Sequence, residues 1–170
     1  AEIGLCTSDP QVLRRAAQAA PVSYVQAAMS VLAPVAARKL LPTARELGTT
    51  LLAFSPLGRG LVAADRDPAS LPIDDARAHT PDIGRVGRAR AEDFRRLAKH
   101  LGASPVDLAL SWLTSLGPDV VPIPGARSRE QVSQTLDAQR RPLSLDERWA
   151  IEAFVRAIND SPAAPEPTVL

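Results

Sequence analysis

Short apolar runs with β-strand character alternate with amphipathic helical segments, and this alternation constrains the fold of the chain more than any other feature. The β-like runs predict strands over 2–6, 22–26, 49–54 and 120–123. Helical periodicity predicts helices over 11–20, 36–47, 91–101, 105–116, 128–136 and from a cap at 144–147 to about 158. Strands separated by helices join through right-handed crossovers into a parallel sheet. The predicted fold class is therefore α/β, with four strand–helix units.

Residues with capping preferences mark the ends of these helices. The segment from Thr7 to Pro10 supplies a side-chain cap followed by a proline in the first helical turn. Gly48 suits the end of a helix, and Ser104-Pro105 repeats the pattern of cap and proline. Ser144 begins a cap that includes Glu147.

Two segments depart from the alternation. The stretch 64–90 is polar and rich in Asp, Pro and Arg, and its length predicts a lid-like loop. The residues 159–170 include three prolines and predict a flexible tail. We therefore expect one domain over 1–158.

One face of the predicted sheet has nothing to cover it. A parallel sheet is normally buried on both faces, but right-handed crossovers of one sense place the helices on one face only. The other face is expected to present Leu5, Tyr24, Gln26, Phe54 and Ile123. A half-barrel of four strands is therefore physically incomplete and needs a partner.

Composition excludes several classes of protein. The chain carries 20 basic and 19 acidic residues, so it has no positive excess for neutralising nucleic-acid phosphates. The single Cys6 rules out an internal disulfide and a cysteine-based metal site. No apolar run approaches the roughly 20 residues that span a membrane, and the expected location is the cytoplasm.

A series of short motifs resembles a known family. In chain order they are Ile3-Gly4-Leu5, Val25-Gln26, Leu41-Pro42-Thr43-Ala44-Arg45-Glu46-Leu47-Gly48, Phe54-Ser55-Pro56-Leu57-Gly58-Arg59-Gly60, Leu108-Ala109-Leu110-Ser111-Trp112-Leu113 and Val121-Pro122-Ile123-Pro124-Gly125-Ala126-Arg127. Their order and spacing are similar to strands five to eight of the aldo-keto reductases. The resemblance covers about 3–154 and implies a (β/α)8 barrel of the TIM type, of which this chain is a half-barrel.

The family passes a hydride from NADPH to a carbonyl, and a Tyr tuned by a Lys, with an Asp and a His, donates the proton. These four residues lie on the first half of the family's barrel, and none of their motifs occurs in this chain. The only tyrosine, Tyr24, matches no catalytic position. The resemblance therefore implies no catalytic residue here.

The resemblance does carry over to the nicotinamide end of the cofactor. Gln26 matches a glutamine that bonds the carboxamide, and an amide suits this role because it both donates and accepts. Cys6 and Thr7 occupy the place of a Ser-Asn pair on the same group, where Thr7 can still donate. Phe54 matches an aromatic residue that stacks on the nicotinamide, and plain core packing is an equal alternative.

The phosphate end of NADPH also has matching segments. Ser55, Leu57, Gly58 and Arg59 resemble the loop that wraps the pyrophosphate, where backbone amides and a cation suit an anion. The remaining matches follow the last strand, where Gly125 and Arg127 correspond to the 2′-phosphate site at a helix start. They are followed by three positions for phosphate and adenine, which this sequence fills with Gln131, Gln134 and Thr135.

Other residues that could carry chemistry have simpler interpretations. Cys6 invites a nucleophile hypothesis, but a lone cysteine without a neighbouring histidine favours an inert thiol. Solvated or exposed positions are expected for His79, His100, Asp74-Asp75 and the cluster of Arg85, Arg88 and Arg90. A metal at the acidic pair and an anion at the arginines are the alternatives. Core packing is expected for Trp112 and Trp149.

Three functions remain open at this point. The first is NADPH-dependent carbonyl reduction by a barrel that a complementing N-terminal half completes. The second is a naturally truncated, redox-inactive homodimer that binds a small molecule or catalyses a non-redox step. The third is a binding or regulatory module on the same fold. All three predict a small-molecule ligand and neither nucleic acid nor membrane as a partner.

Overall fold

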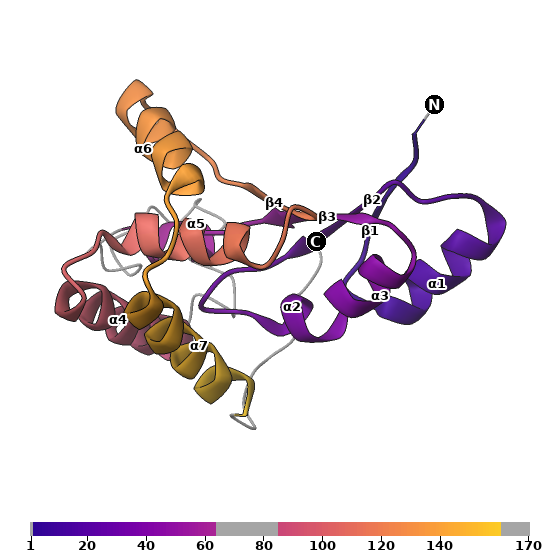
Figure 1. The fold of residues 1–170 in the computed structure, drawn as a ribbon. Coiled ribbons are helices and arrows are strands. Elements are labelled where there is room, and N and C mark those ends of the chain that lie inside the picture. Colours follow the sequence, from indigo (N-terminus) through magenta and orange to yellow (C-terminus); the bar gives the residue numbers. More distant parts are fainter. Residues whose placement is uncertain (1, 64–84, 161–170) are drawn as a thin grey trace.

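Four parallel strands form one sheet at the centre of the computed structural model, which describes residues 2–63 and 85–160 (Figure 1). The strands are β1 (Gly4–Cys6), β2 (Tyr24–Ala28), β3 (Thr50–Phe54) and β4 (Val120–Ile123), and they lie in chain order. The predicted α/β half-barrel is therefore confirmed. β2 starts and ends two residues later than predicted, because pairing with Gly4–Cys6 and Thr50–Phe54 sets its limits.

Helices follow each strand. They are α1 (Pro10–Ala19), α2 (Val35–Lys39), α3 (Leu41–Glu46), α4 (Arg85–His100), α5 (Pro105–Ser115), α6 (Arg129–Arg140) and α7 (Leu145–Asn159), with a short 3-10 helix η1 (Gly58–Gly60). In Figure 1, α1 to α4 and α7 lie on one side of the strands, whereas α6 stands away from the sheet. The helices thus cover one face.

Side-chain caps start several helices where the sequence predicts them. Asp9 accepts a hydrogen bond from the backbone N–H of Gln11 at 2.7 Å, directly before Pro10. Ser104 caps α5 by accepting a hydrogen bond from the backbone N–H of Asp107 at 3.4 Å, directly before Pro105. Ser144 and Glu147 form a reciprocal capping box at the start of α7.

Three predicted helix limits are wrong. The helix expected over 36–47 breaks at Leu40 into α2 and α3, because Pro42 has no N–H for the helical ladder and restricts the residue before it. α4 begins at Arg85, so 85–90 is helical rather than loop, and 64–84 lies outside the described residues. α6 continues beyond 136 to Arg140, directly before Arg141 and Pro142.

The hydrophobic core lies between the sheet and the helices. Alternate strand residues point into it, and Val25, Leu51 and Val120 form one buried row across the sheet. Leu5 pairs with Val25 and packs against this core, so its expected place on the uncovered face is wrong. On the helix side, Phe94 of α4 and Phe154 of α7 pack with ring centroids 5.3 Å apart.

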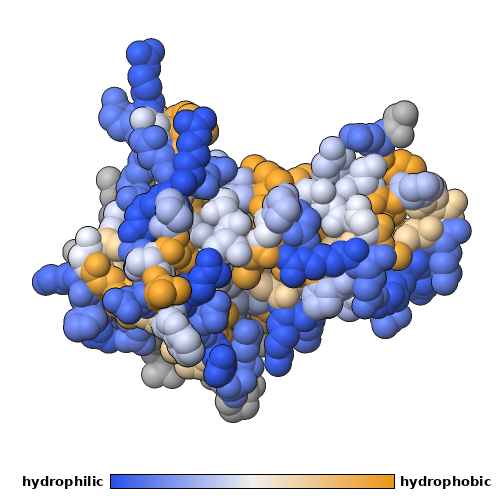
Figure 2. Space-filling view, in the orientation of Figure 1, coloured by the Kyte–Doolittle hydropathy of each residue, from blue (hydrophilic) through white to orange (hydrophobic). Residues whose placement is uncertain are grey.

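The opposite face of the sheet is open within the described residues. It carries Cys6 and Gln26, which are exposed, and the β4 residues Val121 and Ile123, which are 42% and 44% exposed. Figure 2 shows apolar side chains reaching the surface near β4. A two-residue period therefore divides the sheet into a buried face and an uncovered one, as the sequence predicts.

The two tryptophans have different environments. Trp112 on α5 is 3% exposed, as expected for a core residue. Trp149 on α7 is 75% exposed, and core packing is therefore wrong for it. Its helix buries Glu147, Ile151 and Ile158, so position 149 falls on the outer side.

Candidate functional site

The predicted nicotinamide residues meet where the carboxyl end of β1 pairs with the middle of β2, and the expectation that Gln26 ends its strand is wrong because β2 continues to Ala28. Cys6 pairs with Gln26 in the parallel ladder, and the backbone N–H of Thr7 donates to the carbonyl oxygen of Gln26 at 3.1 Å. The Thr7 hydroxyl oxygen accepts from the backbone N–H of Asp9 at 3.1 Å. The hydrogen bonds between the strands therefore hold the Thr7 backbone beside that of Gln26. The Gln26 side chain is exposed and lies on the uncovered face.

Phe54 ends the neighbouring strand on the same face. It pairs with Ala28 and Ile123, and Ala28 follows Gln26 by two residues, so strand alternation puts all four on one side. The ring is half-buried, and the Phe54 carbonyl accepts from the Met29 N–H at 3.2 Å. An exposed amide and a partly open aromatic face suit a flat, polar heterocycle.

The segment from Ser55 to Gly60 has an unusual backbone. Ser55, Gly58, Arg59 and Gly60 have φ angles of 52°, 57°, 55° and 96°. Glycine adopts such angles freely, whereas a non-glycine residue costs about 1–3 kcal/mol there. Turn hydrogen bonds hold the shape, among them Gly58 N–H to Ser55 O at 2.9 Å and Gly60 N–H to Leu57 O at 3.0 Å. Gly58, Arg59 and Gly60 are thus three consecutive residues with positive φ, and the N–H groups of Gly58 and Gly60 donate within the loop itself.

This loop packs closely against the loop that follows β2. A Cβ added at Gly58 would lie 2.8 Å from Cδ1 of Leu32, a side chain that is buried. A larger residue at 58 would therefore displace Leu32 and also take up an unfavourable left-handed conformation. The two strand-end loops thus form one packed unit.

The start of α6 contains the residues predicted for the 2′-phosphate. Gly125 and Arg127 are exposed, and the Arg127 backbone N–H donates to Oε1 of Gln131 at 2.7 Å. Ser128 caps the helix by accepting from the Gln131 N–H at 3.3 Å. Hydrogen bonds from its own backbone and from Ser128 hold the pKa of Glu130 below its ordinary value. An ionised carboxylate therefore lies in the same helical turn as the predicted anion site.

Gln134 contacts a different element. Its amide nitrogen donates to Oγ of Ser104 and to Oδ1 of Asp107, both at 3.3 Å. These residues start α5, so Gln134 joins α6 to α5, and Thr135 beside it is half-buried. The structure therefore brings Arg127 and Gln131 together but engages the Gln134 side chain elsewhere.

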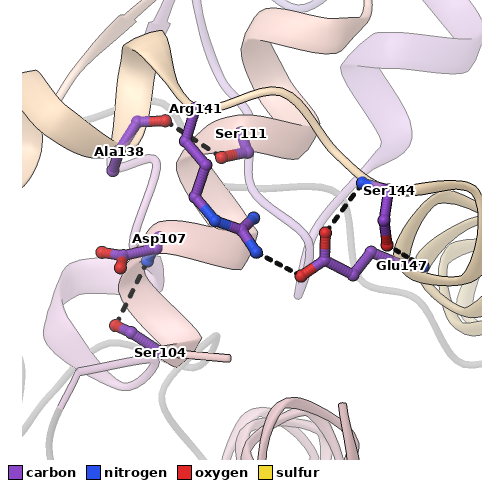
Figure 3. Close-up of polar contacts among 7 residues, drawn as sticks. All are labelled: Ser104, Asp107, Ser111, Ala138, Arg141, Ser144 and Glu147. Carbon is purple, nitrogen blue, oxygen red and sulfur yellow. Dashed lines mark hydrogen bonds and ion pairs between the residues drawn. The ribbon is translucent and has the colours of Figure 1, made fainter. Parts of the chain in front are cut away.

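Figure 3 shows the polar contacts that connect α5, α6 and α7. Ser111 donates to the carbonyl of Ala138 at 2.9 Å, and Arg141 forms an ion pair with the buried carboxylate of Glu147. Burial raises the pKa of Glu147, but the Arg141 guanidinium and the Ser144 N–H outweigh it and hold that pKa below its ordinary value. The capping box is readable from sequence, whereas the ion pair depends on the turn between the helices.

Arg90 is the clearest functional candidate that the sequence misassigns. A solvated position is expected, yet the side chain is half-buried and its Nη1 donates to the Leu32 carbonyl at 3.2 Å. Desolvation lowers the pKa of Arg90. The only sequence signal for this burial is the helical stripe of Ala91, Phe94 and Ala98 beside it, which appears once the helix is extended back to Arg85.

Within the part of the chain that the structure describes, the remaining candidates form no further cluster. Cys6 is exposed, and His100 is exposed as expected. His79 and Asp74-Asp75 lie outside the described residues. Over 2–63 and 85–160, no group of three or more His, Cys, Asp and Glu side chains could hold a metal ion. In the same ranges no helix is long and apolar enough to cross a membrane.

Comparison with known proteins assigns the family. The model of the aldo/keto reductase family matches residues 1–156, and the chain belongs to this family. A probable aldo-keto reductase from Glycine max is 32% identical over 146 residues, which are 80% of this chain and 40% of that protein. The sequence-based resemblance is therefore confirmed.

Solved structures agree with this assignment. The glycerol dehydrogenase of Gluconobacter oxydans superposes with a TM-score of 0.76 at 25% identity, over 99% of this chain and 52% of that one. An aldo-keto reductase of Bacillus halodurans has the same fold, with a TM-score of 0.68 at 22% identity over 90% of this chain and 49% of its own. The chain thus spans about half the length of these relatives.

Proposed function

We propose that the chain forms the cofactor-binding half of an NADPH-dependent carbonyl reductase. The observation that carries the proposal is the placement of Gln26 and Phe54 on one uncovered face of adjacent strands, where Phe54 ends β3 and Gln26 lies two residues before the carboxyl end of β2. The left-handed loop from Ser55 to Gly60 begins directly after Phe54. In a (β/α)8 barrel these strand ends form the active-site face.

The residues of this chain would bind and orient, and those of a complementing half would transfer the proton. NADPH supplies a hydride to the carbonyl carbon of a small-molecule substrate, and the carbonyl oxygen takes a proton. Gln26 would hold the carboxamide with its amide group, while Phe54 would pack against the ring and fix its plane. The loop from Ser55 to Arg59 would bind the pyrophosphate.

Tyr24 does not fit the role of proton donor. It lies at the amino end of β2, four residues before the end of that strand at Ala28. A hydrogen bond and negative charge from Glu2 raise the pKa of Tyr24. A phenol that acts as a general acid near neutral pH is tuned in the other direction. We therefore expect the proton donor to belong to the first half of the barrel, as the resemblance to the family implies.

The start of α6 supports a weaker contact with the cofactor. The cation of Arg127 and the helix amino terminus favour an anion, but Glu130 places a negative charge in the same turn. A 2′-phosphate would also compete with Gln131 for the Arg127 N–H. Most of the binding free energy is therefore expected from the nicotinamide and pyrophosphate contacts.

Replacement of Gln26 tests the proposal. Gln26→Leu removes the carboxamide contact and is expected to weaken NADPH binding about tenfold, as loss of a buried hydrogen-bonding partner does. Isothermal titration would be done with the chain alone and with a complementing N-terminal half from a relative. Gln18→Leu is the matched control, because Gln18 is an exposed residue of α1 far from the strand ends. No saturable NADPH binding by the unaltered chain in either setting would contradict the proposal.

A redox-inactive homodimer that binds a small molecule is the second candidate. The exposed apolar side chains of Val121 and Ile123 favour it, since a second copy would cover them. The engagement of Gln134 with α5 also removes one predicted adenine contact. Sedimentation equilibrium separates the candidates: a stable dimer that binds no NADPH supports the second, and a monomer that associates only with a complementing half supports the first.

A further inference from the structure

Two arginines of α4 each donate to the backbone of a strand-end loop. Arg90 Nη1 donates to the Leu32 carbonyl at 3.2 Å, and Arg95 Nη1 donates to the Leu61 carbonyl at 2.6 Å. Leu32 lies in the loop after β2, and Leu61 lies in the loop after β3. One helix therefore bonds to both loops at the carboxyl edge of the sheet.

The position of the two arginines follows from helix geometry. The buried stripe of α4 consists of Ala91, Phe94 and Ala98, which are at most 1% exposed. At about 3.6 residues per turn, Arg90 and Arg95 fall on opposite margins of this stripe. Packing of the stripe against the core thus fixes the helix, and its margins place one guanidinium at each loop.

The bonded loops also touch each other. Gly58 faces Leu32 so closely that a Cβ at 58 would lie 2.8 Å from the leucine side chain. The ends of the strands that lead into the loops are joined by the bond from Met29 N–H to Phe54 O at 3.2 Å. Movement of either loop would therefore alter the other.

The loop after β3 needs such support. Ser55 and Arg59 hold left-handed angles that residues with side chains adopt at a cost, and such conformations persist only where the surroundings fix them. A guanidinium donor makes a stronger hydrogen bond to a carbonyl than a neutral donor does. Arg90 and Arg95 supply two of these bonds from outside the loops.

We propose that Arg90 and Arg95 are positioning residues that clamp the two strand-end loops together and so hold the backbone from Ser55 to Gly60 in its positive-φ conformation. The proposal rests on the proposed function where it assigns the cofactor pyrophosphate to this loop. Neither arginine is required to touch the cofactor. Their effect passes through the carbonyls of Leu32 and Leu61.

Hydrogen exchange tests the clamp without any cofactor. Arg90→Met and Arg95→Met keep side-chain length and remove the donors, and the backbone amides of 31–33 and 57–63 are expected to exchange about tenfold faster. Arg95→Lys keeps a charged donor and is expected to restore most of the protection. Arg96→Met is the matched control, because Arg96 pairs with Asp93 on the exposed side of α4. Unchanged exchange in both loops of the Met variants overturns the clamp.

Two ligand titrations connect the clamp to the proposed function. NADPH affinity is expected to fall about tenfold in Arg95→Met, with little change for 2′-AMP, which lacks the pyrophosphate. Equal losses for both ligands, or faster exchange throughout the chain, indicate general destabilisation and overturn the positioning role. If the unaltered chain binds no NADPH, the proposed function fails, and the exchange pattern alone then supports or overturns the clamp.

Discussion

The two faces of the sheet are built from the same strands but have different roles. One face, with Val25, Leu51 and Val120, is fully buried under helices and stabilises the fold. The other, with Gln26, Phe54 and Ile123, is open within the described residues and carries the polar and aromatic groups of the candidate site. The difference shows that the half-barrel has one completed core, while no element of the described residues covers the face that carries the candidate site.

The largest expected effect is a difference in folding stability between substitutions at two neighbouring residues of β3. Leu51→Ala creates a cavity on the buried face and is expected to lower the free energy of unfolding by about 2–5 kcal/mol. Leu52→Ala alters the half-buried residue of the uncovered face and is expected to cost about 1 kcal/mol or less. Urea denaturation of both variants measures the difference. Equal losses would mean that the uncovered face is packed as tightly as the covered one.

An intermediate effect concerns the polar contacts on the helix side. Glu147→Gln removes the charge that pairs with Arg141 and is expected to lower the free energy of unfolding by about 1–3 kcal/mol at neutral pH. The folded-state pKa of Glu147 is lowered, so its stabilisation is present above the unfolded pKa of about 4.3 and is lost as pH falls through the folded value. Urea denaturation as a function of pH measures this.

The pH dependence of the stability difference between the unaltered chain and Glu147→Gln serves as the control. If Glu147 causes the acid-dependent loss, the gap between the unaltered chain and Glu147→Gln narrows as the pH falls below the unfolded pKa. A gap of constant size from neutral to acidic pH would show that the carboxylate contributes through packing rather than through its charge.

The smallest effect on stability is expected on the uncovered face at β4. Ile123→Thr keeps a β-branched residue and is expected to change the free energy of unfolding of the chain by about 0.5 kcal/mol or less. Association with a second copy or a complementing half is expected to weaken, because Ile123 is 44% exposed and apolar. Analytical ultracentrifugation measures association, and thiol labelling of Cys6 on the same face reports whether that face is covered. A large loss of folding stability without loss of association would reverse the assignment of the two faces.

Much of the fold is readable from local sequence because its signals are local. The caps at Asp9, Ser104 and Ser144 act within one helical turn. The assignment of Gln26 and Phe54 to the uncovered face follows from a period of two along each strand. The expectation for Leu5 is wrong because the strand expected over 2–6 is only Gly4–Cys6 in the structure, and the pairing of Leu5 with Val25 puts it on the buried face.

In the candidate site too, some features could be predicted from the sequence and others could not. The glycines after Phe54 indicate a left-handed loop from the sequence alone. The sequence does not indicate that Ser55 and Arg59 also adopt positive φ angles. Arg90 belongs to a charged segment, and only the packing of α4 shows that it reaches the Leu32 carbonyl. Gln134 lies in the right part of the chain for a cofactor contact, yet the nearby start of α5 takes up its amide.

The sequence by itself therefore determined the parallel half-barrel, its family, the order of the site segments and the one face that no described element covers. These depend on periodicity, capping and motif order, all of which are properties of the sequence itself. The tertiary structure alone decided which side of α7 is buried, leaving Trp149 outside, and which carbonyls the α4 arginines reach. The reason is that burial of a helix face and the partner of a long polar side chain depend on neighbours distant in sequence.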